Sequence, residues 1–177
     1  MKRIGDEMDL NPKIMGLVFD YIHFYGNVDV YKYTRNVYRR EVRVIRNHQG
    51  IQSWKDAQSF KDKDFGKILC KKIDAKILHY GWARKEQIMA NKVDAFEKLY
   101  HEEEKASANF KYRREWGMKR YQGTHPKVLL KWIKENENPI DVLSLKTSFA
   151  FNSIGLIICD FIESLTGYRI RTDLFFQ

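Results

Sequence analysis

The stretch KILHYGWARK, Lys76 to Lys85, decides the fold prediction. It begins as a short apolar strand, ends in His79, Trp82 and Arg84, and passes directly into a helical pattern. A buried core strand does not require a histidine, a tryptophan and an arginine at its exit, whereas ligand clefts in α/β sheets open at the carboxyl ends of strands. The stretch therefore predicts a strand whose end lines a binding cleft.

The rest of the first half predicts further strands. Residues 14–26 (IMGLVFDYIHFYG) are rich in apolar and aromatic side chains, which is typical of a mostly buried strand. Residues 38–47 (YRREVRVIRN) alternate as a half-exposed strand does, and the turn signal at 47–50 favours a hairpin into residues 51–54. Residues 67–80 hold two short apolar runs separated around Asp74.

The second half predicts three helices. The first covers residues 85–104, with one apolar stripe opposite a charged face. The second begins at Thr124 or His125, has proline in its first turn, and ends at about residue 136. The last ends at Gly167 and is strongly apolar, but polar residues interrupt it well short of the ~20 residues that span a bilayer. A docked helix and an interfacial helix both remain open for it.

Composition sets the outer limits. The chain has 177 residues, 44% of them hydrophobic, which predicts a single domain over residues 1–177, with residues 140–177 as a C-terminal helix and tail. The formal net charge of +9 favours anionic partners, whether nucleic acid, phosphorylated metabolites or anionic lipid. With two cysteines and no zinc spacing, the sequence indicates a reducing, cytoplasmic location.

Arginine dominates the segment Lys32–His48, which carries six cations against Glu41 alone. The planar guanidinium suits phosphate or carboxylate recognition, so Arg39 and Arg40 are candidate ligand contacts. A solvated strand face with cross-strand ion pairs explains the same pattern equally well.

Several further residue types suit a polar ligand, each with a structural alternative. His79 could complete a divalent metal site or bind a phosphate, although a lone histidine is more often structural. Asp56, in a polar loop, could act as a general base or simply as a loop acid, and Gln58 could bind a sugar hydroxyl or face water. His23 and Tyr25 share one strand face that suits carbohydrate as well as an ordinary sheet.

Six blocks, in order along the chain, resemble bacterial family 2 (GT-A type) glycosyltransferases. They are GLVFDYIHFYGN, YRREVRVIRN, IQSWKDAQSF, ILHYGWAR, YQGTHPKV and ESLTGYRI. The resemblance implies an α/β fold, with strands of a mixed sheet followed by three helices. It also implies inverting transfer of a sugar from a nucleotide-diphosphate sugar to a hydroxyl of a carbohydrate or glycolipid acceptor, with a divalent cation, Mg or Mn, as cofactor.

The resemblance also implies roles for individual residues. Asp56 becomes the catalytic base and His79 a ligand to the metal or the diphosphate. Substrate-binding roles fall to His23, Tyr25, Arg39, Arg40, Gln58, Trp82 and Arg84.

The family's first half, which carries the nucleotide-binding units and an acidic metal motif, has no counterpart here, so the resemblance covers a partial GT-A-like fold whose N-terminal nucleotide-binding half is missing. We therefore expect no transferase activity from this chain alone, and we expect self-association or a partner chain at an open sheet edge. The alternative is a non-catalytic basic module on the same fold, binding nucleic acid or, peripherally, the inner face of a membrane. Nucleic acid is the less favoured partner because no standard motif supports it.

Overall fold

The computed structural model describes residues 6–34, 37–54, 59–100, 110–147 and 151–167. These residues form a mixed α/β structure, with a sheet built mainly in the first half and helices in the second. Contacts divide the chain into two compact units, residues 1–22 with 38–78 and residues 23–37 with 79–177. The strands β1 (Gly16–Tyr25) and β6 (Cys70–Trp82) each contribute residues to both units.

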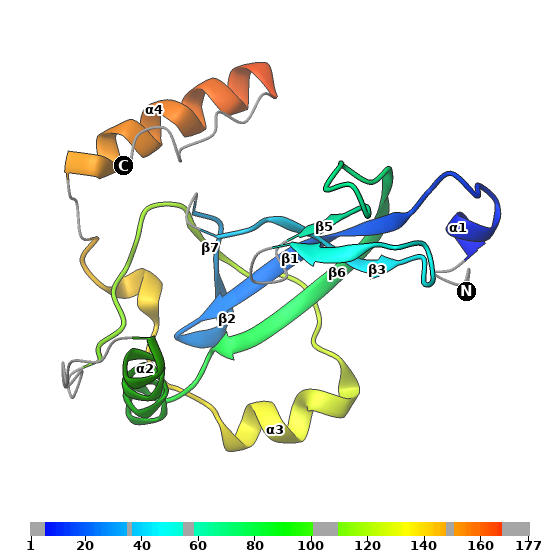
Figure 1. Cartoon of the computed structure of the whole chain (residues 1–177). Coiled ribbons are helices and arrows are strands. Elements are labelled where there is room, and N and C mark those ends of the chain that lie inside the picture. The colour runs from blue at the N-terminus through cyan, green and yellow to red at the C-terminus, as the bar shows by residue number, and fades with distance from the viewer. Residues whose placement is uncertain (1–5, 35–36, 55–58, 101–109, 148–150, 168–177) are drawn as a thin grey trace. The chain divides into compact units, whose positions relative to one another are not determined.

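The two longest strands, β1 and β6, pair with each other (Figure 1). The amide of Gly16 donates to the Leu69 carbonyl, and the amide of Gly26 donates to the Trp82 carbonyl. Because both bonds follow the same chain direction, the two strands run in parallel and their carboxyl ends are neighbours.

The first unit contains α1 (Asp6–Asp9), β3 (Arg40–Ile45), β4 (Gln52–Trp54) and β5 (Ser59–Lys61) besides the beginnings of β1 and β6. β3 pairs antiparallel with the first half of β1. The core packs Leu17 and Phe19 of β1 against Ile73 and Ile77 of β6, which share one strand face because side chains alternate with a period of two.

The second unit contains β2 (Asn27–Lys32), α2 (Glu86–Tyr100), β7 (Met118–Arg120), the 3₁₀ turns η1 (Lys127–Leu129) and η2 (Val142–Ser144), α3 (Leu130–Glu135) and α4 (Phe151–Thr166). β2 pairs antiparallel with the end of β1 and with β7. Its core joins Tyr25, Met89, Tyr112 and Val142, all buried.

A single glycine makes the sharp turn from β1 to β2. Gly26 has φ +81°, and a Cβ built on it would lie 2.2 Å from Cγ2 of Val142. Only glycine combines this left-handed backbone with so close an approach. The chain therefore reverses direction at the carboxyl end of β1.

The strand prediction for residues 14–26 is confirmed, and the expected hairpin between β3 and residues 51–54 is wrong. Residues 51–54 do not form a hairpin with β3, because β4 pairs with β5. The two apolar runs around Asp74 form one continuous strand, β6, since Asp74 lies on its exposed face while Ile73 and Ala75 face the core.

The predicted helices are confirmed, with different starts and ends. α2 begins at Glu86, and the predicted part beyond residue 100 lies outside the described residues. Neither Thr124 nor His125 caps the second helix, which opens as η1 behind Pro126 and continues as α3. α4 ends at Thr166, with Gly167 at φ +68° as the predicted stop.

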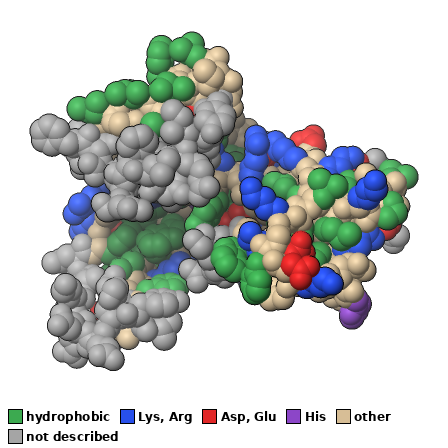
Figure 2. Space-filling model, turned by 45° about the horizontal axis from the view of Figure 1, so that its top comes forward, with side chains coloured by type: hydrophobic (Ala, Val, Ile, Leu, Met, Phe, Trp, Pro, Cys, Tyr) green, Lys and Arg blue, Asp and Glu red, His purple; other side chains and the backbone are tan. Residues whose placement is uncertain are grey.

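One face of α4 is apolar and exposed (Figure 2). Ile154, Ile158, Phe161 and Leu165 are each between 54% and 70% exposed. Asp160, also on α4, accepts a hydrogen bond at Oδ2 from the indole Nε1 of Trp116 at 3.1 Å. Among the described residues, no helix is both long enough and apolar enough to cross a membrane.

Candidate functional site

The carboxyl ends of β1 and β6 meet at one place in the second unit. The hydrogen bond from the Gly26 amide to the Trp82 carbonyl measures 2.9 Å and lies where both strands end. Chain segments that leave two parallel strands side by side commonly line a ligand cleft. The stretch from Lys76 to Lys85, with its histidine, tryptophan and arginine, therefore ends where a site is expected.

A pocket of about 250 Å³ opens at these strand ends. Asn27, Val28 and Asp29 line it directly after β1, and Ala83 lines it directly after β6. The opposite wall comes from α3 and the residues that follow it. It supplies Leu130 and Ile133 as apolar groups and Lys134 and Glu137 as charged ones.

The pocket is small and of mixed polarity. Its volume lies below the roughly 300–1,000 Å³ of typical drug-sized sites, so it fits one sugar ring better than a whole nucleotide sugar. Two carboxylates, one ammonium group and apolar side chains around one space can serve the hydroxyls and the CH faces of a carbohydrate.

Side chains from distant segments hold the exit of β6 in place. Asn138 Nδ2 donates to the carbonyls of Gly26 and Arg84, at 2.9 and 3.1 Å. The Tyr112 hydroxyl lies 2.9 Å from the Trp82 carbonyl and 2.7 Å from the Arg84 carbonyl. Burial is the main cause that raises the pKa of Tyr112, so this hydroxyl stays a donor at neutral pH.

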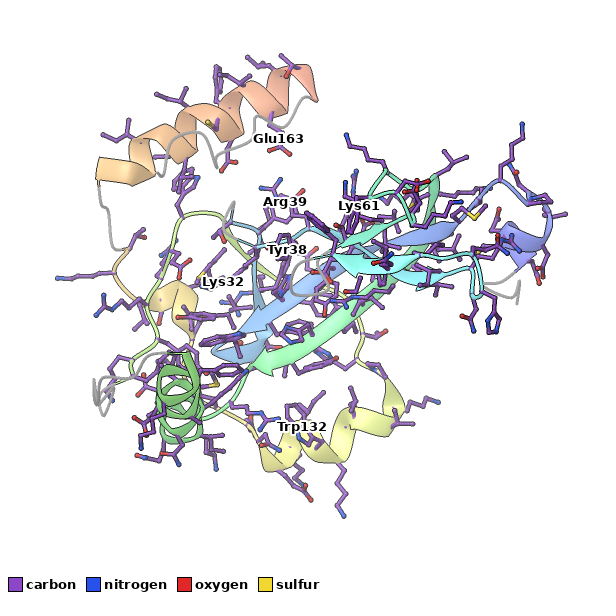
Figure 3. The ribbon with its side chains drawn as sticks, in the orientation of Figure 1. Lys32, Tyr38, Arg39, Lys61, Trp132 and Glu163 are labelled. Carbon is purple, nitrogen blue, oxygen red and sulfur yellow. The ribbon has the colours of Figure 1, made fainter. Side chains whose placement is uncertain are left out.

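An aromatic cluster covers one face of the strand ends. The Phe24 ring stacks on Tyr80 with centroids 4.8 Å apart, and the centroid of the Trp132 ring lies 5.9 Å from that of Tyr80. Trp132 projects from α3 (Figure 3). The Tyr80 hydroxyl lies 2.8 Å from Nδ1 of His125. Burial lowers the pKa of His125, opposed by the Asp29 carboxylate, and burial also raises the pKa of Tyr80. At neutral pH the pair is therefore a neutral hydrogen-bonded couple.

His79 and His23 lie on the other face of the same strands. Their rings are edge to face with centroids 5.4 Å apart. The His79 ring lies over Gly81, because a Cβ built on Gly81 would come within 2.7 Å of His79 Nε2. Glycine at this position thus makes room for the imidazole.

Arg84 and Lys92 bring two cations to the same exit. The guanidinium carbon of Arg84 lies 5.4 Å from the centre of the Trp132 ring. Lys92, on α2, donates from Nζ to the Gly81 carbonyl at 3.0 Å and lies 4.9 Å from the centre of the Trp82 ring. Burial, reinforced by the charge of Arg84, lowers the pKa of Lys92.

The structure brings together five of the residues singled out in the sequence. His23, Tyr25, His79, Trp82 and Arg84 all belong to the second unit and lie at or beside the ends of β1 and β6. Their clustering agrees with the predicted cleft-lining strand exit, whereas their substrate roles stay predictions.

The other four candidates stand apart from this group. Arg39 and Arg40 belong to the first unit, where Nε of Arg40 donates to Asp20 at 3.2 Å across the β1–β3 pair. The proposed base Asp56 and its neighbour Gln58 lie outside the described residues.

Most described cations of the basic segment make internal contacts. Arg43 pairs with the buried Glu41, and Arg46 donates to the carbonyls of Met8 and Ile14. Lys32 bonds Glu115 at 2.6 Å. Together with the Arg40–Asp20 pair, these contacts follow the ion-paired strand face rather than an open phosphate-binding stripe.

A divalent metal does not fit the described part of this site. In that part of the chain no three His, Cys, Asp or Glu side chains gather as metal ligands do. His79 has His23 beside it, but Mg²⁺ and Mn²⁺ prefer several oxygen ligands. No step is therefore assigned to a metal here.

Sequence reasoning missed several residues of this site, Lys92, Tyr112, His125 and Trp132 among them. Tyr112, His125 and Trp132 come from segments far along the chain from the strand end that they contact, and Lys92 comes from the helix that directly follows it. Two of the four left a signal in the sequence: Lys92 through its helix, and His125 through the block YQGTHPKV.

Comparison with known proteins gives no further assignment. No protein-family model, no curated protein and no solved structure matches the chain. A function for the chain is therefore a proposal, which rests on the chemistry of its residues and on the resemblance of the six sequence blocks.

Proposed function

We propose that this chain is a glycosyltransferase-family protein that binds a nucleotide-diphosphate sugar and a carbohydrate acceptor at the carboxyl ends of β1 and β6. The observation that carries the proposal is the pocket of mixed polarity that opens directly after both strands. It stands next to the residues that the family resemblance singles out, among them His79, Trp82 and Arg84.

The pocket supports a carbohydrate better than an isolated phosphate or an apolar ligand. Asp29 and Glu137 are acceptors for sugar hydroxyls, and Lys134 is a donor. Two acids against one base would repel a free phosphate. The aromatic rings nearby, including Trp132 and Tyr80, suit the CH faces of a sugar.

In the proposed reaction an acceptor hydroxyl attacks the anomeric carbon from the side opposite the diphosphate. The new bond joins the acceptor oxygen to that carbon, the bond to the diphosphate oxygen breaks, and the hydroxyl proton passes to the Asp56 carboxylate. Asp56 keeps this role on the strength of the family resemblance alone.

Carbohydrate binding and turnover are tested separately. Saturation-transfer NMR with a panel of nucleotide-diphosphate sugars and oligosaccharides identifies a ligand of the purified chain. Its Kd is then measured for Asp29→Asn and Glu137→Gln, which keep the shape of the side chains, and for Asp64→Asn, an exposed control carboxylate of the first unit. We expect at least about tenfold weaker binding for either pocket variant, because a hydrogen bond to a charged group contributes roughly 1.5–3 kcal/mol.

The outcomes are distinct. No binding by the wild-type chain to any sugar refutes the proposal, and so does equal binding by the pocket variants and the control. We expect the purified chain alone to transfer no sugar, so clear transfer contradicts that expectation. If transfer is seen, its loss in Asp56→Asn with binding kept supports the proposed base, and unchanged transfer by that variant removes it.

A further inference from the structure

The outer edge of β6 has no strand partner among the described residues. β3 and β2 pair with successive parts of one edge of β1, and β6 takes the other edge. In the described part of the chain β6 pairs with β1 alone. A long edge strand presents a row of N–H and C=O groups to which another strand can bond, and β6 has 13 residues.

The core of the first unit is well covered at β1 and only partly covered at β6. Leu17 and Phe19 of β1 are 0% and 4% exposed. Three side chains of β6 pack against the same core and are only partly buried, namely Ile73, Ala75 and Ile77. A strand added to the outer edge of β6 would extend the sheet over this core and bury these side chains further.

Two opposite charges on the other face of β6 have no ion-pair partner among the described residues. Lys72 pairs with Asp20 of its own chain at 2.9 Å. Asp74 and Lys76 are exposed, and neither forms such a pair with a described residue. Because they stand two positions apart, both side chains leave the strand on the same face, where they can meet a neighbouring strand.

We propose that a second copy of this chain pairs antiparallel with the open edge of β6, about a two-fold axis at Ala75. The axis stands perpendicular to the sheet, so the two sheets join into one with their core faces on the same side. Asp74 of each copy then lies opposite Lys76 of the other, and Ile73 lies opposite Ile77. This interface goes beyond the proposed function and does not depend on it.

The backbone and the charges both select this register. Since the Leu69 carbonyl accepts from the Gly16 amide, the odd-numbered residues that follow in β6 direct their N–H and C=O groups to β1, and the even-numbered ones direct theirs to the open edge. Only registers that pair even with even residues bond across the edge and keep the core faces together. Moving the axis by one residue sets Asp74 against Asp74 or Lys76 against Lys76, and like charges directly opposite each other are destabilising.

The edge is complementary to itself, which favours a second copy over an unrelated strand. One two-fold axis gives Asp74 and Lys76 of both copies a partner of opposite charge. A single pair of strands contributes fewer residues than the roughly 20–30 a side of a standard interface, so we expect a Kd in the micromolar range.

Charge reversal tests the pairing, with sedimentation velocity of the full chain over a concentration series as the measurement. Asp74→Lys and Lys76→Asp each set like charges opposite one another, and the combined change D74K/K76D restores opposite ones. Asp64→Lys is the matched control, because Asp64 is exposed in the same unit outside β6 and its reversal changes the net charge as Asp74→Lys does. We expect each β6 single variant to raise the Kd at least about tenfold, and the combined variant and the control to stay within about threefold of wild type.

Oxidative cross-linking tests the position of the axis. In the proposed register Ala75 faces its own copy in a non-hydrogen-bonded pair, whose Cα atoms lie about 4.5 Å apart. This distance is within the roughly 4.4–6.8 Å that a disulfide spans. Ala75→Cys should therefore form a covalent dimer on oxidation, whereas Asp64→Cys should form no more than wild type, since Cys70 and Cys159 are present in all three proteins.

Each result supports or overturns the proposal. A wild-type chain that stays monomeric across the series overturns it, and so does a dimer that neither reversal weakens or that Asp64→Lys weakens equally. A combined variant that stays monomeric with an unchanged circular dichroism spectrum and Tm overturns the charge register. If a charge variant unfolds, the cross-link decides, and a wild-type dimer without a cross-link in folded Ala75→Cys overturns the axis at Ala75.

Discussion

Replacing Tyr112 by Phe and Asn138 by Ala should destabilise the protein by more than the sum of the two single changes. Both side chains donate to the carbonyl of Arg84, so either single variant leaves that carbonyl one donor. The double variant leaves it with no side-chain donor. A half-buried carbonyl without a partner costs roughly 1–3 kcal/mol beyond the bonds themselves.

The single changes can be bounded from their contacts. Tyr112→Phe keeps the buried ring and the Trp82 carbonyl keeps the Gly26 amide, so we expect a loss of about 1 kcal/mol. Asn138→Ala removes two bonds of 2.9 and 3.1 Å, for about 2 kcal/mol. The double variant should then lose about 4 kcal/mol or more, with a coupling of about 1 kcal/mol or more.

Urea unfolding, followed by circular dichroism, measures the four corners of this cycle. The control cycle uses Tyr121→Phe in place of Tyr112→Phe, since among the described residues the Tyr121 hydroxyl hydrogen-bonds only the exposed Thr124 carbonyl, at 3.3 Å. That control pair should be additive within about 0.5 kcal/mol. Additivity within the same limit for Tyr112→Phe with Asn138→Ala would refute the shared carbonyl and with it the account of how the β6 exit is fixed.

Three further predictions follow from single features. Gly26→Ala should destabilise the fold by about 2–5 kcal/mol, because left-handed backbone strain adds to the clash with Val142. Gly155→Ala in α4, where an added Cβ meets nothing within 4 Å, should stabilise the fold by up to about 1 kcal/mol. Equal unfolding free energies for the two variants would contradict this. Because burial lowers the folded-state pKa of His125, its contribution to stability is complete above about pH 6.5 and is lost as the pH falls below that; the loss should shrink in His125→Gln, and an identical pH profile for wild type and variant would count against it. Most described cations of segment Lys32–His48 make internal contacts, so the protein should bind duplex DNA no more tightly than non-specific DNA-binding proteins do. A Kd in the nanomolar range at physiological salt, measured by fluorescence anisotropy, would contradict this prediction.

Local sequence patterns predicted the elements whose own residues determine them. The apolar stretch of residues 14–26 forms β1, the strongly apolar last helix forms α4, and α4 stops at Gly167 as predicted. Asp74 separates two apolar runs in the sequence but does not interrupt β6, because a single acid on the solvent face of a strand costs little while its neighbours reach the core. The expected β3–β4 hairpin is wrong because β4 pairs with β5. In the turn between β3 and β4, His48 and Gly50 have left-handed backbone conformations.

Only the part of the site formed by the end of β6 could be predicted from the sequence. The composition of residues 76–85 pointed to the exit of β6, and the pocket opens there. Lys92, Tyr112 and Asn138 reach that exit through contacts 11 to 54 residues away in sequence. Such contacts depend on how the chain folds back, which no local periodicity encodes.

The central claim is that ligands bind where β1 and β6 end, and chemical-shift mapping of the ¹⁵N-labelled chain tests it most directly. A nucleotide-diphosphate sugar is titrated into the protein, and the backbone amides are followed residue by residue. The account predicts the largest amide shifts at Asn27, Asp29, Ala83 and Asn138. The amides of β4 and β5, in the first unit, serve as the reference and should shift less. Saturable shifts confined to other residues, or none at millimolar ligand, would contradict it.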